Sequence, residues 1–302
     1  MKTLKLKRLS TTLLCLGLIA SAPAFAEDTA LPTEAQAQSE ATESIQPQVD
    51  ANASDQAAEK RKKITSDAVA AVNETKKALK LLDEKKIDEA LAALERATGK
   101  LELILVRAPE LALAPVDVVV NTYDLLASLD TVKAVIHEVE NYLEDGEVQK
   151  ARSLLGNLAS EIVISTTNIP LATYPEAIKA ITPLIDAGKI DEAKLGLQAA
   201  LNTLVITDKV IPLPVTRAEK LLKKAEELAE SKQRTDKDNE SLAKQLDEAR
   251  KQLKMAELLG YGDKKAFKPM YEQLDAIEKK SVGGKGGKGW FDKLKQQLSD
   301  LI

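Results

Sequence analysis

The chain has 302 residues, 30% of them charged, a net charge of −4 and only 3% aromatic residues. Nucleic-acid binders need positive charge, and those that bind single strands also need aromatic stacking platforms, so this composition argues against both. One Cys and one His leave little for thiol, zinc or histidine chemistry, and the abundance of Ala, Leu, Lys, Glu and Asp favours helices.

Residues 1–26 are predicted to be a secretory signal peptide. Four positive residues precede an apolar stretch at 13–20, and Ala24-Phe25-Ala26 forms a small-x-small cleavage site. A transmembrane anchor needs about 20 apolar residues, more than this stretch offers. A lipoprotein is also disfavoured, because Cys15 lies too early in the apolar stretch. We therefore expect cleavage near Ala26 and no stable membrane insertion.

Residues 27–60 are predicted to be an acidic, disordered linker. All eight charged residues from 27 to 59 are acidic, and large apolar residues are scarce. Removal of the signal peptide, which carries four positive and no negative residues, changes the net charge from −4 to −8. A solubilising or electrostatic arm is the alternative interpretation of this segment.

From residue 61 the apolar residues recur at helical spacing, and one turn pattern occurs three times. The pattern reads apolar, two polar, Gly or Lys, polar, Ile or Val, two polar, Ala, and it occupies 82–90, 143–151 and 185–193. Gly146 and Gly188 suit a left-handed helix C-cap. We predict three helical hairpins. Their unequal spacing favours an irregular bundle over a regular solenoid.

The connections between these hairpins are apolar and contain prolines, at 108–123, 165–176 and 210–214. Proline prevents a continuous helix there. One interpretation is that the connectors are extended segments buried against helices. The other is that they line a ligand groove or a subunit interface. The candidate interface residues are Leu111, Leu113, Val116, Val118, Val119 and Tyr174.

Three strings in the connectors carry a family resemblance: APELALAPVDVVVNTYDLL (108–126), NLASEIVISTTNIPLATYPEAIKAI (157–181) and VIPLPVTRAE (210–219). They closely resemble the YfdX family of bacterial secreted proteins, and the resemblance covers roughly 64–230. It implies an all-helical domain, a periplasmic location and homo-oligomerisation, including as tetramers. It also implies association with envelope stress, with acid or heat tolerance and with drug resistance. The family has no agreed catalytic motif, so no active-site residue is carried over.

The chain continues past this 61–230 domain with a helical extension (231–280) and a Gly/Lys hinge (281–289). An amphipathic helix (290–302) closes the sequence, and we predict that it docks on another subunit or on another envelope protein. Packing of this helix on its own core is the alternative. Its charges cancel, whereas a membrane-surface helix is usually more basic. The candidate docking residues are Trp290, Phe291, Leu294, Leu298, Leu301 and Ile302.

Motifs for catalysis and metal binding are lacking. His137 has no second His and no Cys to form a zinc site, and we expect it at a surface or edge. The acidic pairs fall at turns and helix starts, where they favour the helix dipole. The Gly/Lys run lacks the spacing of a phosphate-binding loop. We expect no catalytic residues, cofactor or metal.

The sequence thus predicts an all-α fold, an irregular bundle of helical hairpins with Pro-punctuated apolar connectors. The predicted function is that of a non-catalytic periplasmic stress-tolerance protein, acting as a homo-oligomer by chaperone-like or ligand-sequestering binding. Its partners would be unfolded client proteins or an envelope protein. The alternative is a helical scaffold that recruits a specific envelope partner through the C-terminal helix.

Overall fold

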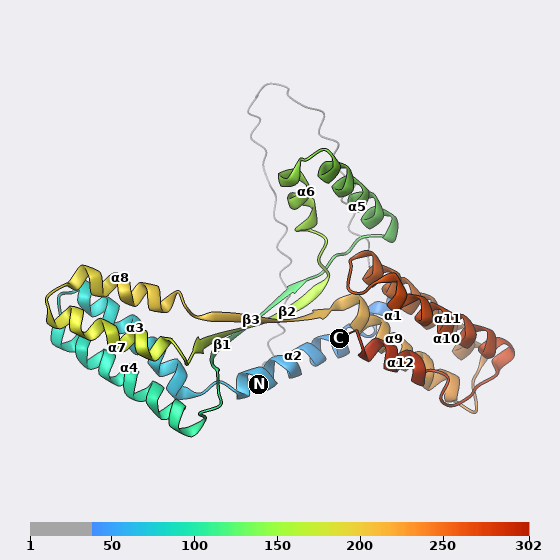
Figure 1. Cartoon of the computed structure of the whole chain (residues 1–302). Helices are drawn as coiled ribbons and strands as arrows, with labels where there is room; N and C mark the ends of the chain where they lie inside the picture. The colour runs from blue at the N-terminus through green and yellow to red at the C-terminus, as the bar shows by residue number, and fades with distance from the viewer. Residues whose placement is uncertain (1–37, 302) are drawn as a thin grey trace, which may run out of the picture. The chain divides into compact units, whose positions relative to one another are not determined.

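The computed structural model describes residues 38–301; the predicted signal peptide, residues 27–37 of the predicted linker and Ile302 lie outside this range. Three helical hairpins follow one another, and a β-strand follows each (Figure 1). The hairpins and their strands are α3 (Ser66–Asp83), α4 (Ile87–Arg107), β1 (Leu113–Tyr123); α5 (Leu129–Glu144), α6 (Val148–Leu155), β2 (Glu161–Pro170); and α7 (Tyr174–Asp186), α8 (Ile190–Leu201), β3 (Val205–Pro212).

The recurring turn pattern produces the three predicted hairpins. Each turn has one residue with positive φ at the same place in the pattern: Lys85 at 59°, Gly146 at 75° and Gly188 at 72°. In each case the next residue but one begins the second helix of the hairpin. The left-handed residue ends the first helix, and the small Ala that completes the pattern is fully buried in each hairpin, at Ala90, Ala151 and Ala193.

The connectors form a three-stranded antiparallel sheet in the order β1-β2-β3, so the all-α prediction is wrong in this respect. The prediction of extended segments was correct, but it missed that they pair with one another. Val, Ile and Thr dominate the strands and favour the pleated conformation. The prolines lie where a missing N–H is tolerated, because Pro170 and Pro212 end their strands and Pro115 borders a bulge.

Most of the buried hydrophobic residues form two core clusters, and the sheet contributes to both. In one, helices α3, α4, α7 and α8 pack with Ala114 and Ile169 of the strands. In the other, the N-terminal and C-terminal helices pack with Val118, Ile162 and Ile211. Helices α5 and α6 pack against each other, and α5 also contacts α10 (Asp236–Leu258).

Residues 38–62 form an ordered segment, contrary to the predicted disorder of 27–60. It comprises α1 (Glu40–Glu43) and α2 (Gln46–Lys62). Val49, Ala53 and Ala57 recur every four residues on α2 and are buried in the core cluster. The short side chains of Ala make this stripe hard to recognise in an otherwise polar segment.

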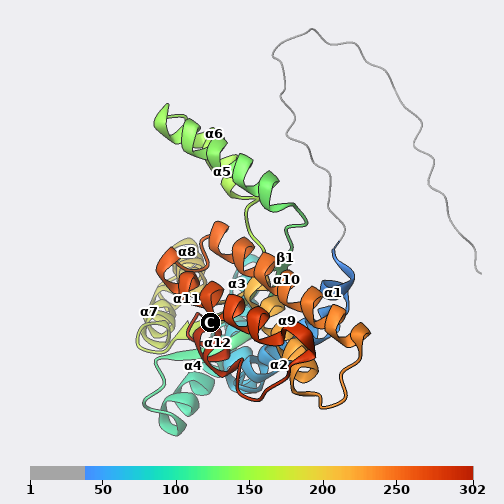
Figure 2. The ribbon, with the colours of Figure 1, turned by 90° about the vertical axis from the view of Figure 1, so that its right-hand side faces the viewer.

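The C-terminal part consists of α9 (Leu213–Glu230), α10 (Asp236–Leu258), α11 (Lys264–Ser281), a 3₁₀ turn (Val282–Gly284) and α12 (Asp292–Ser299), and Figure 2 views it from its own side. The predicted hinge is anchored within the chain. Gly287 N donates to the Ala229 carbonyl at 3.2 Å, and Arg234 Nη2 donates to the Lys285 carbonyl at 2.7 Å. No helix within residues 38–301 combines the length and apolarity that a membrane span requires.

Candidate functional site

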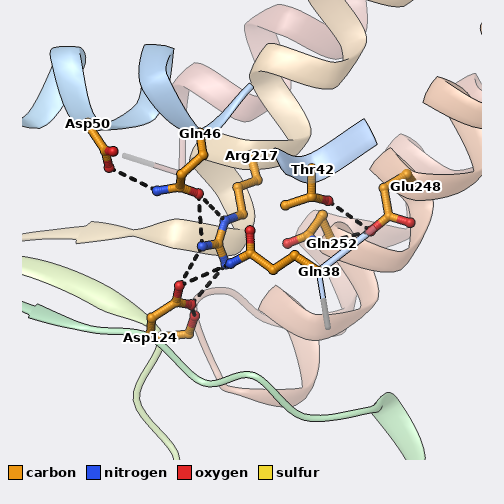
Figure 3. Close-up of polar contacts among 9 residues, drawn as sticks. Gln38, Thr42, Gln46, Asp50, Asp124, Arg217, Glu248 and Gln252 are labelled. Atoms are coloured by element: carbon orange, nitrogen blue, oxygen red, sulfur yellow. Dashed lines mark hydrogen bonds and ion pairs between the residues drawn. The ribbon is translucent and has the colours of Figure 1, made fainter. Parts of the chain in front are cut away.

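A buried polar cluster surrounds Arg217 on α9, whose side chain is 4% exposed (Figure 3). Its guanidinium donates to both carboxylate oxygens of Asp124, from Nη1 at 3.0 Å and from Nη2 at 2.7 Å. Nε and Nη2 also donate to Oε1 of Gln46 on α2, at 3.2 and 3.0 Å. The cluster thus joins three segments that are far apart in the sequence.

Sheet topology explains why these residues meet. Strands β1 and β3 both run antiparallel to β2, so they run parallel to each other, and their C-terminal ends lie at the same end of the sheet. Asp124 directly follows β1, and Arg217 lies in the first turns of α9, directly after β3. Ser160, which precedes β2, lies at the same end of the sheet, and its carbonyl accepts a hydrogen bond from Leu213 N at 2.9 Å.

A second group of contacts holds α1 against α10. The Thr42 hydroxyl donates to Oε1 of Glu248 at 3.1 Å, and Gln252 Nε2 donates to the same oxygen at 3.2 Å. Both Thr42 and Glu248 are buried. Nearby, the Tyr261 hydroxyl donates to Glu161 at 2.8 Å, and burial raises the pKa of this phenol far above its ordinary value.

A cavity of about 510 Å³ lies between these two groups of contacts. Its walls combine apolar side chains of the β1–α5 connection and α10 with Arg217, Glu248 and Lys251. The charged groups are largely engaged with one another, because Arg217 pairs with Asp124 and Glu248 lies 3.7 Å from Lys251. The arrangement is therefore suited to tying segments together.

His137 lies outside this cluster, on α5, with its side chain 76% exposed and Nδ1 3.8 Å from Glu140. This surface position is the one that the sequence predicted. Within residues 38–301, no three His, Asp or Glu side chains are arranged to hold a metal ion.

The predicted interface residues separate into buried and exposed positions. Val118 and Tyr174 are buried in different core clusters and are not available at the surface. Leu111, Leu113 and Val116 are half-buried, and Leu111 and Val116 pack against the α3–α4–α7–α8 core. Val119 is 45% exposed and is the member of this group that lies open on the sheet.

The predicted docking helix is part of the core. Phe291, Leu294 and Leu298 are buried in the same cluster as α9, α10 and α11, and Trp290 and Leu301 are half-buried against it. The helix therefore packs on its own core, which was the alternative to docking on another subunit or envelope protein. Gly286, which precedes it, allows close packing, because a Cβ there would collide with the carbonyl oxygen of Ala229.

One face of the sheet is rich in exposed apolar side chains, and sequence reasoning missed it as a surface. Side chains alternate along a strand, and the pairing register places Val119, Tyr123, Val163, Ile206 and Val210 on this outer sheet face. Ile206 is 64% exposed, Tyr123 51% and Val210 42%. The many β-branched residues of the connectors were the sequence feature that could have indicated strands with such a face.

Residues 71–210 match the family model described as YfdX protein. This part of the chain belongs to the YfdX family. A solved structure of YfdX from Salmonella Typhi is 14% identical, with a TM-score of 0.35; the match covers 50% of this chain and 93% of that one. No curated protein matches the sequence.

The YfdX match includes β1, β2 and most of β3 but neither α1 and α2 nor α9 to α12. Asp124 lies within the matched residues, whereas Gln46, Arg217 and Glu248 lie outside them. The polar cluster therefore joins the YfdX region to the segments that precede and follow it.

Proposed function

We propose that this YfdX-family protein is a non-catalytic, periplasmic stress-tolerance protein that holds partly unfolded client proteins during envelope, heat or acid stress. The predicted signal peptide supports export. The pairing of Arg217 with Asp124 supports a non-catalytic role, because the guanidinium and the carboxylate of this cluster bind each other.

The observation that carries the proposal is the outer sheet face. Monomeric soluble proteins rarely leave several large apolar side chains together on a surface without an interaction to serve. On this face Ile206, Tyr123, Val119 and Val210 are each more than two-fifths exposed. Unfolded clients expose apolar segments, and such a face can take up those segments without a defined sequence.

The edges of the sheet support the same function. β1 and β3 each have one neighbour in the sheet, and their outer edges can accept an extended peptide as an added strand. Such edges also promote uncontrolled aggregation, which natural proteins limit with charges. Asp117 on β1 and Asp208 on β3 are exposed and provide such charges, and the pairing register places both on the outer sheet face among its apolar side chains.

Homo-oligomerisation is part of the proposal, because an apolar sheet face also attracts its counterpart on a second copy. Val119 is the predicted interface residue that remains exposed on this face. Self-association and client binding then compete for the same surface. We expect an added client to shift the assembly towards smaller species in sedimentation velocity experiments.

Aggregation of a model client, reduced insulin, tests the proposal in the presence of the exported chain. Ile206→Asp places a charge on the outer sheet face and should weaken protection several-fold. Leu195→Asp is the matched control, since Leu195 on α8 is 66% exposed and Ile206 is 64% exposed. Wild-type protein that fails to slow aggregation, or equal losses in the two variants, would contradict the proposal.

A further inference from the structure

The opposite face of the sheet is apolar too, and two segments of the same chain cover it: α2 lies against β1 and β2, and α9 lies against β2 and β3. Val118, Ile162, Ile164 and Ile211 point to this inner sheet face and are at most 6% exposed. Residues 38–62, here called the N-terminal strap, contact β1, β2 and α9 through α2 (Figures 1 and 2). The strap precedes the matched YfdX region and covers strands that belong to it.

The apolar contacts of the strap are small. On α2 they consist of Val49, Ala53 and Ala57, with Ile45 just before the helix. An alanine side chain buries little apolar area, so each Ala contributes less to the attachment than a Leu or Ile would. The remaining positions of α2 are exposed or half-buried and mostly polar.

Two grooves that open to solvent flank the strap. The cavity of about 510 Å³ lies beside its first residues, Gln38, Ser39 and Thr42. A second cavity of about 440 Å³ lies between Asn52 and Gln56 of α2 and residues of α9 and α12. The buried Oε1 of Gln56 has no hydrogen-bond donor among the described residues.

Polar contacts complete the attachment, and the core can lose them without stranding a charge. Gln46 accepts from Arg217, and Ser44 accepts from Lys224 at 2.9 Å. If the strap leaves, Arg217 still has both carboxylate oxygens of Asp124. Glu248 likewise loses Thr42 but keeps Gln252. A buried charge that lost its only partner would oppose opening strongly.

We propose that the N-terminal strap is a displaceable cover and that the inner sheet face beneath it is a second binding surface for extended, apolar polypeptide segments. The face suits such a partner because it presents a row of β-branched side chains on paired strands. This inference rests on the proposed client-holding function, and it adds a second site and the device that controls access to it.

A charge placed beneath the strap tests the inference in the full exported chain. Ala53→Glu forces a carboxylate into the buried stripe of α2 and should detach it. Ala58→Glu is the matched control, because Ala58 lies on the exposed side of the same helix. Hydrogen exchange of 46–62 and of β2, binding of a hydrophobic dye and protection of reduced insulin are measured for both.

The expected result is faster exchange in both segments, several-fold more dye binding and several-fold better client protection for Ala53→Glu, with Ala58→Glu unchanged. Faster exchange with wild-type levels of protection would overturn the inference and leave the proposed function standing. Failure of both wild type and the opened variant to protect would refute the proposed function itself. Unchanged exchange in Ala53→Glu would show that the strap is a fixed part of the core.

A gentler variant decides the matter if Ala53→Glu does not fold. Gln46→Ala combined with Thr42→Val removes two polar contacts of the strap and adds no buried charge. The double variant should increase both the hydrogen exchange of 46–62 and the protection of the client, each by a smaller factor than Ala53→Glu. A folded double variant with unchanged exchange would overturn the inference.

Discussion

Arg217 and Asp124 are 93 positions apart in the sequence and form a bidentate ion pair at the end of the sheet where β1 and β3 terminate. The carboxylate comes from the end of β1 and the guanidinium from the helix that follows β3. The pair therefore fixes the exit directions of two strands that do not pair with each other.

Removing one partner should show how much this pair stabilises the fold. Asp124→Ala is expected to lower the free energy of unfolding by about 2–3 kcal/mol, less than the ~3–5 kcal/mol of fully buried pairs, because 28% of the Asp124 side chain is exposed. Urea unfolding measures the change. Arg107→Ala, which breaks an exposed pair with Asp67, should cost less than about 1 kcal/mol. Equal effects of the two substitutions would contradict this prediction.

The C-terminal helix should behave as core. Leu294 is fully buried, so Leu294→Ala is expected to destabilise the chain by about 2–5 kcal/mol, since it removes apolar contacts and leaves a cavity. Its exposed neighbour gives the control: Lys293→Ala should stay within about 0.5 kcal/mol of wild type. Chemical denaturation with an unchanged midpoint for Leu294→Ala would mean that α12 is detached in solution.

The three hairpin turns differ in how well their residues suit the left-handed conformation. Lys85→Gly should stabilise the chain by about 0.5–1 kcal/mol, because glycine relieves the strain of a positive φ. Gly188→Ala should destabilise the chain by about 1 kcal/mol. Because no atom lies within 4 Å of the added Cβ, this loss of stability comes from the strained backbone conformation. Lys85→Ala removes the same charge but keeps the strain, and thermal melting should show no gain.

Acid should weaken the α3–α4 hairpin through Glu74. The Arg96 guanidinium donates to this carboxylate at 2.8 Å and holds the pKa of the Glu74 carboxyl below its ordinary value of 4.5. A lowered pKa in the folded state contributes stability above pH 4.5, and this contribution is lost as the pH falls through the folded-state pKa. Glu74→Gln should flatten the dependence of stability on pH below 4.5. An NMR titration that finds an ordinary pKa would contradict the prediction.

The hairpins could be predicted from sequence because each turn is specified locally. A left-handed residue, a following Ile or Val and a small Ala lie within nine positions, as in 185–193. The sheet could not be predicted in the same way. Its strands pair across whole hairpins, and only β2 has a burial pattern that alternates along most of the strand, since β3 is exposed along most of its length.

The two ends of the chain show why composition misled. The strap has a disorder-like composition, yet Ala53 and Ala57 fit against the sheet because they are small. The glycines at 283–289 suggested a hinge, but Gly286 is required where the backbone passes close to Ala229. In both segments the deciding factor is a close approach to a distant part of the chain. The buried Arg217 cluster escaped detection for the same reason.

The interleaving of hairpins and strands also sets an order of events in folding. Each hairpin consists of local contacts and can form within microseconds. Each strand pairing must close a loop that contains an entire hairpin, α5–α6 for β1 with β2 and α7–α8 for β2 with β3. Sheet closure is therefore the slow step, because non-local pairing bears the entropic cost of loop closure before its contacts form. Until the sheet has closed, both faces of the strands are exposed and can associate with other unfolded chains.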